Sequence, residues 1–186
     1  MRILVSGTTG GIGGAVKRAA EAAGHEVCEV NRGGFDAPLE GPFDAFVFAT
    51  GTCPVTPIAR LSDAELAETM AVNCGLFVKL MRRLVVEGLV AATGLRALAV
   101  SSVSATEGWA GGAAYCASKG ALSAVCRALD AELKGRGISV VALEPRYVKT
   151  KMFDACAGRM GVADSLAQDP EKFALEILRQ LQGEKR

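Results

Sequence analysis

The sequence has almost no histidine and no paired cysteines, which removes the usual protein ligands of a structural metal. His25 is the single histidine among 186 residues, and none of the six cysteines is spaced as CxxC. A zinc site needs three or four such ligands at characteristic spacings, so we expect no metal. The cysteines are better explained as small buried hydrophobic residues. Free thiols of this kind favour a reducing, cytoplasmic setting.

An excess of one charge and long apolar segments are missing as well. Lys plus Arg number 21 and Asp plus Glu number 20, a balance that gives no support for nucleic-acid or anionic-membrane binding. No run of about 18 apolar residues is long enough to span a bilayer. Residues 1–6 lead directly into a glycine turn, without the apolar region of a signal peptide. We therefore expect a soluble chain.

Short apolar runs alternate with longer helical patterns, and together they predict an α/β fold. Ser62 and Glu65 form a capping box at the start of one helix, and Asp169 with Pro170 starts the last. The segment between the second and third runs is short, so we expect the strand there to be only a stub around Phe35 and Asp36. The predicted strands are residues 3–5, 27–30, 45–49, 95–100 and 139–143, and the predicted helices are 12–23, 62–86, 115–134 and 171–182.

This order predicts one domain over residues 1–186. Strands separated by helices of this length form a three-layer, doubly wound, Rossmann-like parallel sheet with helices on both faces. Counting the stub, we expect about six strands.

A glycine-rich turn follows the first predicted strand and opens the first helix. Gly7, Gly11 and Gly13 are spaced GxxxGxG. Glycines let a backbone approach a ligand closely, and a helix N-terminus offers free N–H groups and a positive dipole end. A glycine-rich surface turn would show the same residues. The position directly after the first strand favours a pyrophosphate site.

The end of the second predicted strand indicates which dinucleotide is held. An acidic residue there binds the ribose 2′-hydroxyl, whereas a basic one accommodates a 2′-phosphate. This chain has Asn31 and Arg32 at that place, and a guanidinium pairs well with phosphate. The alternative is an ordinary exposed loop arginine. We expect NADPH or NADP+, with NADH less favoured.

Tyr115 and Lys119 lie four residues apart at the start of a predicted helix and so share one face. An ammonium beside a phenol favours the phenolate, so we expect Lys119 to lower the pKa of Tyr115. A tyrosine tuned in this way exchanges protons near neutral pH. Ser102 ends a predicted strand, where its hydroxyl could hydrogen-bond a substrate oxygen.

With these motifs in this order, the chain resembles the short-chain dehydrogenase/reductase family over about residues 1–152. The family shares a Rossmann-like sheet and an Asn-Ser-Tyr-Lys active site. The matching residues are the turn from Ser6 to Gly13, Thr50-Gly51, Val72-Asn73, Ser101-Ser102, Tyr115-Cys116-Ala117-Ser118-Lys119, and the segment from Pro145 to Thr150.

The resemblance implies a role for each catalytic residue. Tyr115 would be the general acid/base, and Lys119 would lower its pKa and bind the nicotinamide ribose. Ser102 would orient the carbonyl. Asn73 would hold a kink in its helix and position a water that relays protons to Lys119.

The resemblance also implies the cofactor contacts. Thr150 would touch the nicotinamide carboxamide or a phosphate, and Asp36 would contact the adenine. The full set expected to bind the cofactor is Gly7, Thr9, Gly11, Ile12, Gly13, Asn31, Arg32, Asp36, Gly51, Tyr115, Lys119, Pro145, Val148 and Thr150.

Several positions depart from the family pattern. Phe48 and Ala49 occupy the asparagine positions of the family's NNAG segment, and Arg146 replaces the usual glycine after Pro145. Family members usually continue into a seventh strand that builds a tetramer interface, and this sequence ends at Arg186. We therefore expect a homodimer through the helices 62–86 and 115–134.

The expected function is an NADPH-dependent carbonyl reductase acting on a small carbonyl or alcohol. The segment 151–168, with Met152, Phe153 and Val162, is predicted to form an apolar lid over the substrate. One alternative is an NADP(H)-binding sensor or regulatory protein of the same fold with little turnover. Another is an epimerase or dehydratase, which the lack of a substrate domain disfavours.

Overall fold

The chain folds around one parallel sheet, and the computed structural model describes residues 1–183, except the side chain of Met160. The sheet order is β2-β1-β3-β4-β5. The strands are β1 (Arg2–Ser6), β2 (Glu26–Val30), β3 (Ala45–Phe48), β4 (Leu95–Val100) and β5 (Ile138–Leu143). The expected strand positions are confirmed within one or two residues.

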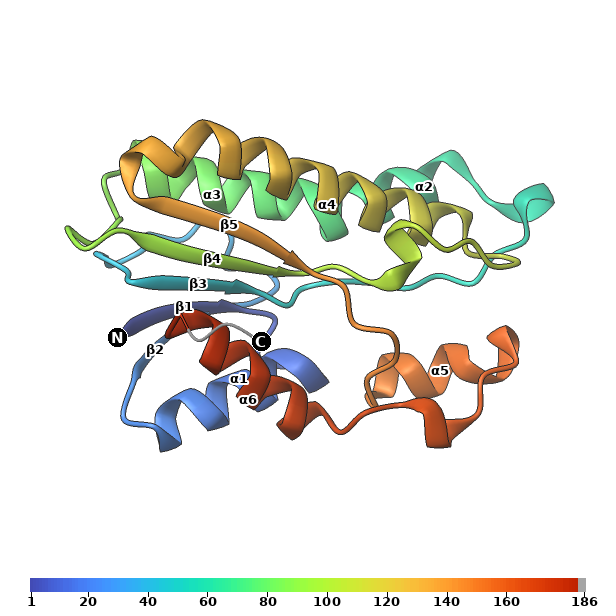
Figure 1. Cartoon of the computed structure of the whole chain (residues 1–186). Helices are drawn as coiled ribbons and strands as arrows, with labels where there is room; N and C mark the ends of the chain where they lie inside the picture. Colours follow the sequence, from blue (N-terminus) through green and yellow to red (C-terminus); the bar gives the residue numbers. More distant parts are fainter. Residues whose placement is uncertain (184–186) are drawn as a thin grey trace.

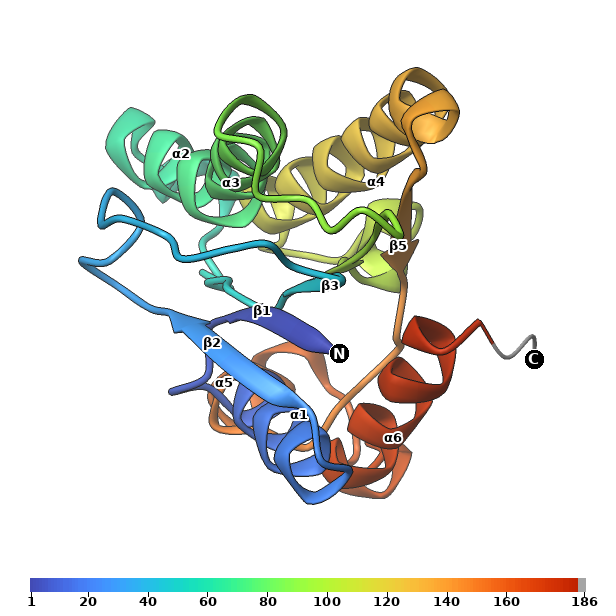
Figure 2. The same ribbon diagram turned by 90° about the vertical axis from the view of Figure 1, so that its left-hand side faces the viewer.

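Helices cover both faces of this sheet (Figures 1 and 2). On one face lie α2 (Asp63–Met70), α3 (Leu76–Val86) and α4 (Ala113–Leu133). On the other lie α1 (Gly11–Ala22), α5 (Lys151–Met160) and α6 (Pro170–Leu181). The three-layer, doubly wound arrangement is as predicted.

The described residues contain five strands, so the expected count of about six was too high. No strand forms around Phe35 and Asp36, and the whole stretch from Asn31 to Asp44 is irregular apart from an isolated bridge at Phe43. Glycine turns begin this segment, and its local hydrogen bonds close turns, from Gly34 N–H to the Asn31 carbonyl for example. Such a segment offers no extended edge for a neighbouring strand.

The core has two layers because each strand alternates its side chains between the two faces. Phe46 and Phe48 of β3 are fully buried toward α3, where the Phe48 ring lies 5.4 Å from that of Phe77. Ala45 and Val47 face α1 and α6. Phe48 thus fills space under α3, which explains how the fold accommodates this departure from the family's asparagine.

The helices α2 and α6 begin at the capping residues that the sequence predicts. The Ser62 hydroxyl accepts a hydrogen bond from Glu65 N–H at 3.1 Å at the start of α2. The Asp169 carboxylate accepts one from Glu171 N–H at 2.7 Å, with Pro170 in the first turn of α6.

Between α2 and α3 the chain makes one π-helical turn, Ala71–Gly75. Within residues 1–183, no helix has both the length and the hydropathy needed to cross a bilayer.

Candidate active site

A cleft of about 760 Å³ opens along the carboxyl ends of the strands. It is lined by residues that follow each strand in turn, among them Gly7, Asn31, Ala49, Ser101 and Pro145. The chain leaves β1 for β2 on one side and reaches β3 on the other. Open parallel sheets bind ligands at such a switch point.

The glycine turn at one end of this cleft is built by close backbone contact. Gly7 has a φ of +76°, and a Cβ on Gly13 would lie 2.3 Å from the Gly7 carbonyl oxygen. Only glycine fits both places. Gly10 precedes α1 without a side-chain cap, so the first N–H groups of the helix are available to an anion.

Two buried oxygens of the cleft wall find no partner among the described residues. They are Oδ1 of Asn31 and Oγ1 of Thr50, and both residues line the cleft. The Asn31 amide is oriented by its Nδ2, which donates to Thr8 Oγ1 at 2.8 Å. Buried polar atoms are normally hydrogen-bonded, so these two fit a polar ligand such as a nucleotide ribose and phosphate.

The other end of the cleft brings Ser102, Tyr115 and Lys119 together. Ser102 follows β4, and the other two lie in the first two turns of α4. The Ser102 hydroxyl is within hydrogen-bonding reach of the Tyr115 phenol. Nζ of Lys119 lies 5.7 Å from the centre of the Tyr115 ring and donates to the Val100 carbonyl at 2.7 Å. A proton donor, a hydroxyl and a buried ammonium therefore share one site.

Burial shifts the pKa values of this site in opposite directions. It raises the pKa of Tyr115 above its usual range, and the hydrogen bond from Ser102 offsets only part of that. It lowers the pKa of Lys119 to about 8. The predicted lowering of the Tyr115 pKa is therefore wrong for the protein alone, because the phenolate would lose more hydration than its neighbours replace. The raised pKa keeps the Tyr115 phenol neutral.

Asn73 lies behind this end of the cleft, in the π-helical turn. Its side chain is fully buried and does not line the cleft. Its Oδ1 accepts from Thr52 N–H at 2.7 Å, and its Nδ2 donates to the Thr52 carbonyl at 2.8 Å and to Ser118 Oγ at 2.9 Å. A π-helical turn interrupts the helix where the kink was expected, and Asn73 ties this turn to the segment after β3 and to α4.

Most of the expected cofactor residues gather in the cleft, and two do not. Gly13 is buried against Gly7 behind the turn. Asp36 lies outside, with a side chain 83% exposed and an ion pair to Lys79 that lowers the pKa of its carboxyl. The expected adenine contact of Asp36 therefore has no support in its position. The expected residues that line the cleft are Gly7, Thr9, Gly11, Ile12, Asn31, Arg32, Gly51, Tyr115, Lys119, Pro145, Val148 and Thr150.

Several residues that line the cleft near Tyr115 were not predicted from the sequence. Trp109 donates from Nε1 to Ser104 Oγ at 3.1 Å, and its ring lies 6.2 Å from that of Tyr115. Its place in the loop just before the tyrosine helix was the available signal. Cys53 and Cys156, assigned only as buried hydrophobic residues, also line the cleft.

The segment predicted as an apolar lid forms α5 beside this end. Met152, Phe153 and Val162 line the cleft. The Cys156 thiol contacts the Cys53 carbonyl at 3.3 Å, joining α5 to the loop after β3. Arg146, which replaces a family glycine, also lines the cleft and forms an ion pair with Glu107 at 2.8 Å.

Comparison with known proteins decides the family. The family model described as short chain dehydrogenase matches residues 34–159, more than half of the chain. The chain belongs to the short chain dehydrogenase family. It is 33% identical over 121 residues to galactitol 2-dehydrogenase (L-tagatose-forming) of Cereibacter sphaeroides. That match covers 63% of this chain and 46% of the relative, so the chain spans about half the length of that curated protein.

Solved structures of this family share the fold. An oxidoreductase of the short chain dehydrogenase/reductase family from Burkholderia thailandensis superposes with a TM-score of 0.83 at 21% identity, over 96% of this chain and 84% of that one. A mutant actinorhodin polyketide ketoreductase with NADPH gives 0.84 at 19% identity, over 98% and 91%. The topology is therefore that of the family, including members bound to a nicotinamide dinucleotide.

Proposed function

We propose that this chain is an oxidoreductase that uses NADPH to interconvert a carbonyl and an alcohol, with Tyr115 as the proton donor. The observation that carries the proposal is a single cleft with a glycine turn at one end and Ser102, Tyr115 and Lys119 at the other. The family relationship supports hydride chemistry, which a bound nicotinamide supplies. The protein supplies orientation and a proton.

The proton would come from the Tyr115 phenol, whose raised pKa keeps it neutral. The Ser102 hydroxyl, within reach of that phenol, would hold the substrate oxygen beside it. As the proton leaves, negative charge develops on the phenol oxygen, and the buried ammonium of Lys119 would stabilise it. Asn73 would hold α4, which carries Tyr115 and Lys119, in place through its hydrogen bonds to Ser118 and Thr52.

Arg32 supports the preference for NADPH. Its side chain lies on the exposed rim of the cleft and has no ion-pair partner within residues 1–183. A free guanidinium beside the end of β2 is suited to a 2′-phosphate. Arg32→Ala should weaken NADPH binding by roughly tenfold or more and leave NADH binding within about twofold. Equal losses for both dinucleotides in a fluorescence titration would contradict this role.

The test of the activity is NADPH oxidation with a panel of aldehydes, ketones and diketones. Tyr115→Phe should lose roughly a hundredfold or more of kcat because general acid catalysis is removed, while NADPH binding is retained. A Tyr115→Phe variant with near-normal turnover would refute the assignment. The expected homodimer through helices 62–86 and 115–134 stays a prediction, for which gel filtration is the measurement.

A sensor that binds NADP(H) without turnover is the second candidate. Burial raises the pKa of Tyr115, which disfavours the phenolate that alcohol oxidation would need as its base. Tight NADPH binding with no oxidation of the cofactor by any member of the panel would support the sensor over the reductase.

A further inference from the structure

The irregular segment after β2 forms one wall of the cleft. Asn31, Arg32 and Phe35 all line the cleft, at the end opposite Tyr115. Phe35 is the one residue buried between 31 and 40, with 8% exposure, and it packs into the core layer under α3. No ladder of strand hydrogen bonds holds this wall in the described residues. Something else must fix its position.

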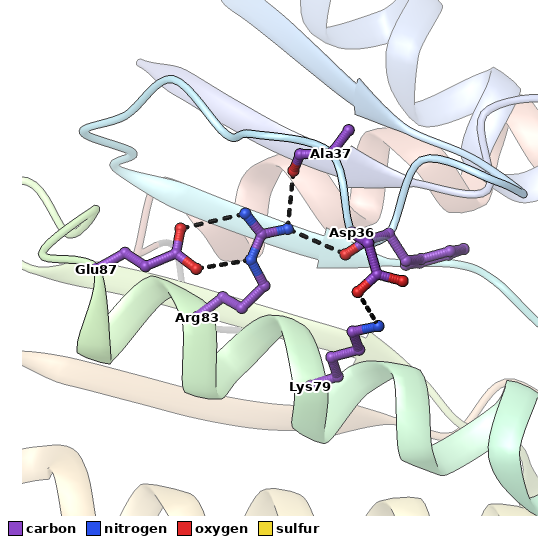
Figure 3. Close-up of polar contacts among 6 residues, drawn as sticks. Asp36, Ala37, Lys79, Arg83 and Glu87 are labelled. Atoms are coloured by element: carbon purple, nitrogen blue, oxygen red, sulfur yellow. Dashed lines mark hydrogen bonds and ion pairs between the residues drawn. The ribbon is translucent and has the colours of Figure 1, made fainter.

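Arg83 of α3 supplies that link. Its Nη1 donates to the carbonyl of Phe35 at 3.0 Å and to that of Ala37 at 2.9 Å. These are backbone contacts to residues 48 and 46 positions earlier in the chain. Two carbonyls that a neighbouring strand would otherwise satisfy are thus bound by one side chain (Figure 3).

The guanidinium itself is held rigidly. Glu87, one helical turn further along, accepts from Nε at 2.8 Å and from Nη2 at 3.1 Å. The Arg83 side chain is only 12% exposed. Four of the five N–H groups of the arginine are therefore used, two on the carboxylate and two on the loop. A planar, bidentate pair of this kind fixes orientation as well as distance.

An ion pair beside Arg83 is a second contact between α3 and this segment. Lys79, one turn before Arg83 on α3, pairs with the carboxylate of Asp36 (Figure 3). Asp36 sits between the two carbonyls that Arg83 binds. This ion pair is largely exposed, with side chains 39% and 83% accessible, so it adds little alone. The main-chain bonds from Arg83 carry the restraint.

We propose that Arg83 is a positioning residue for the adenosine end of the cleft. By binding the backbone on both sides of Asp36 it holds Phe35 and Arg32 in place for the dinucleotide. This inference rests on the proposed function in that the cleft binds a nicotinamide dinucleotide. It adds a residue on α3 that never touches the ligand and yet sets its affinity.

Arg83→Ala should weaken binding and leave chemistry intact. Without the guanidinium, the segment 33–37 samples other conformations, and apparent affinity falls with the fraction that remains competent. We expect roughly a tenfold rise in Kd for NADPH and for adenosine 2′,5′-bisphosphate. At saturating NADPH, kcat should stay within about twofold, because the tyrosine end of the cleft is unchanged.

The neighbouring Arg82 provides the matched control. It is the same residue type on the same helix, and it is exposed. Arg82→Ala should bind both ligands as the wild type does. Arg83→Lys should recover only part of the affinity, because an ammonium has no planar fork to join the carboxylate and both carbonyls. Glu87→Gln should cost about two- to threefold, since it loosens the guanidinium without removing it.

Binding is measured by calorimetry with adenosine 2′,5′-bisphosphate, and order by amide hydrogen exchange of residues 33–37. Faster exchange together with the affinity loss in Arg83→Ala supports the proposal. Wild-type affinity in Arg83→Ala overturns it, and so does an affinity loss with unchanged exchange. Thermal melting of each variant establishes that it is folded, and a folded Arg83→Lys variant carries the same test if Arg83→Ala is not.

The outcome separates this proposal from the proposed function. If the wild type binds the bisphosphate and responds to Arg83→Ala but reduces no carbonyl, the reductase assignment fails and the positioning role stands. If the wild type reduces carbonyls and Arg83→Ala keeps both affinity and exchange, the positioning role fails alone. A wild-type protein that binds neither NADPH nor the bisphosphate overturns both.

Discussion

Lys119 makes the stability of this protein depend on pH in a direction that can be measured. Its side chain is 5% exposed, and burial lowers its pKa from 10.5 to about 8. Between about pH 8 and pH 10.5, Lys119 keeps its proton in the unfolded chain but has lost it in the folded chain. The unfolded state then binds more protons, so raising the pH favours folding. At ~1.4 kcal/mol per pH unit, the full effect is about 3 kcal/mol.

The experiment compares the wild type with Lys119→Met by urea unfolding from pH 7 to pH 9.5. The substitution also leaves the Val100 carbonyl without its donor, but that cost does not vary with pH. The free energy of unfolding of the wild type should therefore rise against that of Lys119→Met by about 2 kcal/mol over this range. Staying below pH 10 avoids the opposite contribution of Tyr115, whose raised pKa destabilises the folded state once the unfolded phenol ionises.

An exposed lysine supplies the control for this measurement. Lys172 is exposed on α6, and Lys172→Met should change the free energy of unfolding by less than about 0.5 kcal/mol. Parallel curves for the wild type and Lys119→Met would show that Lys119 titrates as a solvated lysine does. That result would refute the buried ammonium on which the proposed role of Lys119 depends.

Three further outcomes are expected. Asn73→Ala should lower the free energy of unfolding by about 2–4 kcal/mol in urea titrations, since it removes a fully buried amide with three hydrogen bonds. Gly13→Ala should lower both melting temperature and NADPH affinity because its Cβ would clash with backbone, whereas Gly135→Ala, with open space around it, should change the free energy of unfolding by less than about 1 kcal/mol. Mass spectrometry after alkylation at pH 8 should find Cys28 modified well before Cys126, which is 1% exposed and whose pKa burial raises to about 12.

The sequence predicted the features that depend on neighbouring residues. The β/α alternation, the capping residues Ser62 and Asp169, and the glycine turn all act within a few positions, and the structure contains each of them. The spacing of Tyr115 and Lys119 likewise follows from one helix. Local pattern was enough for the fold and for the gathering of Ser102, Tyr115 and Lys119 at one end of the cleft.

The features that the sequence did not predict depend on distant contacts. The segment around Phe35 is not a strand, and the arginine that binds it lies 48 positions away. The periodicity of apolar residues along the sequence does not indicate a contact between residues so far apart. The family resemblance implies an adenine contact for Asp36, but Asp36 does not line the cleft and pairs with Lys79 instead. The pKa of Tyr115 depends on the desolvation of its hydroxyl, which spacing alone does not give.

The π-helical turn at Ala71–Gly75 makes the helical region before β4 two helices with separate phases. A turn of this kind carries one residue more than an α-helical turn. The extra residue rotates α2 about the helix axis relative to α3. With this rotation, α2 packs against α4, while the apolar face of α3 packs against the sheet. Deleting one residue here would turn α2 by roughly 100° about the helix axis relative to α3, so insertions and deletions should be tolerated far less at this turn than their small size suggests.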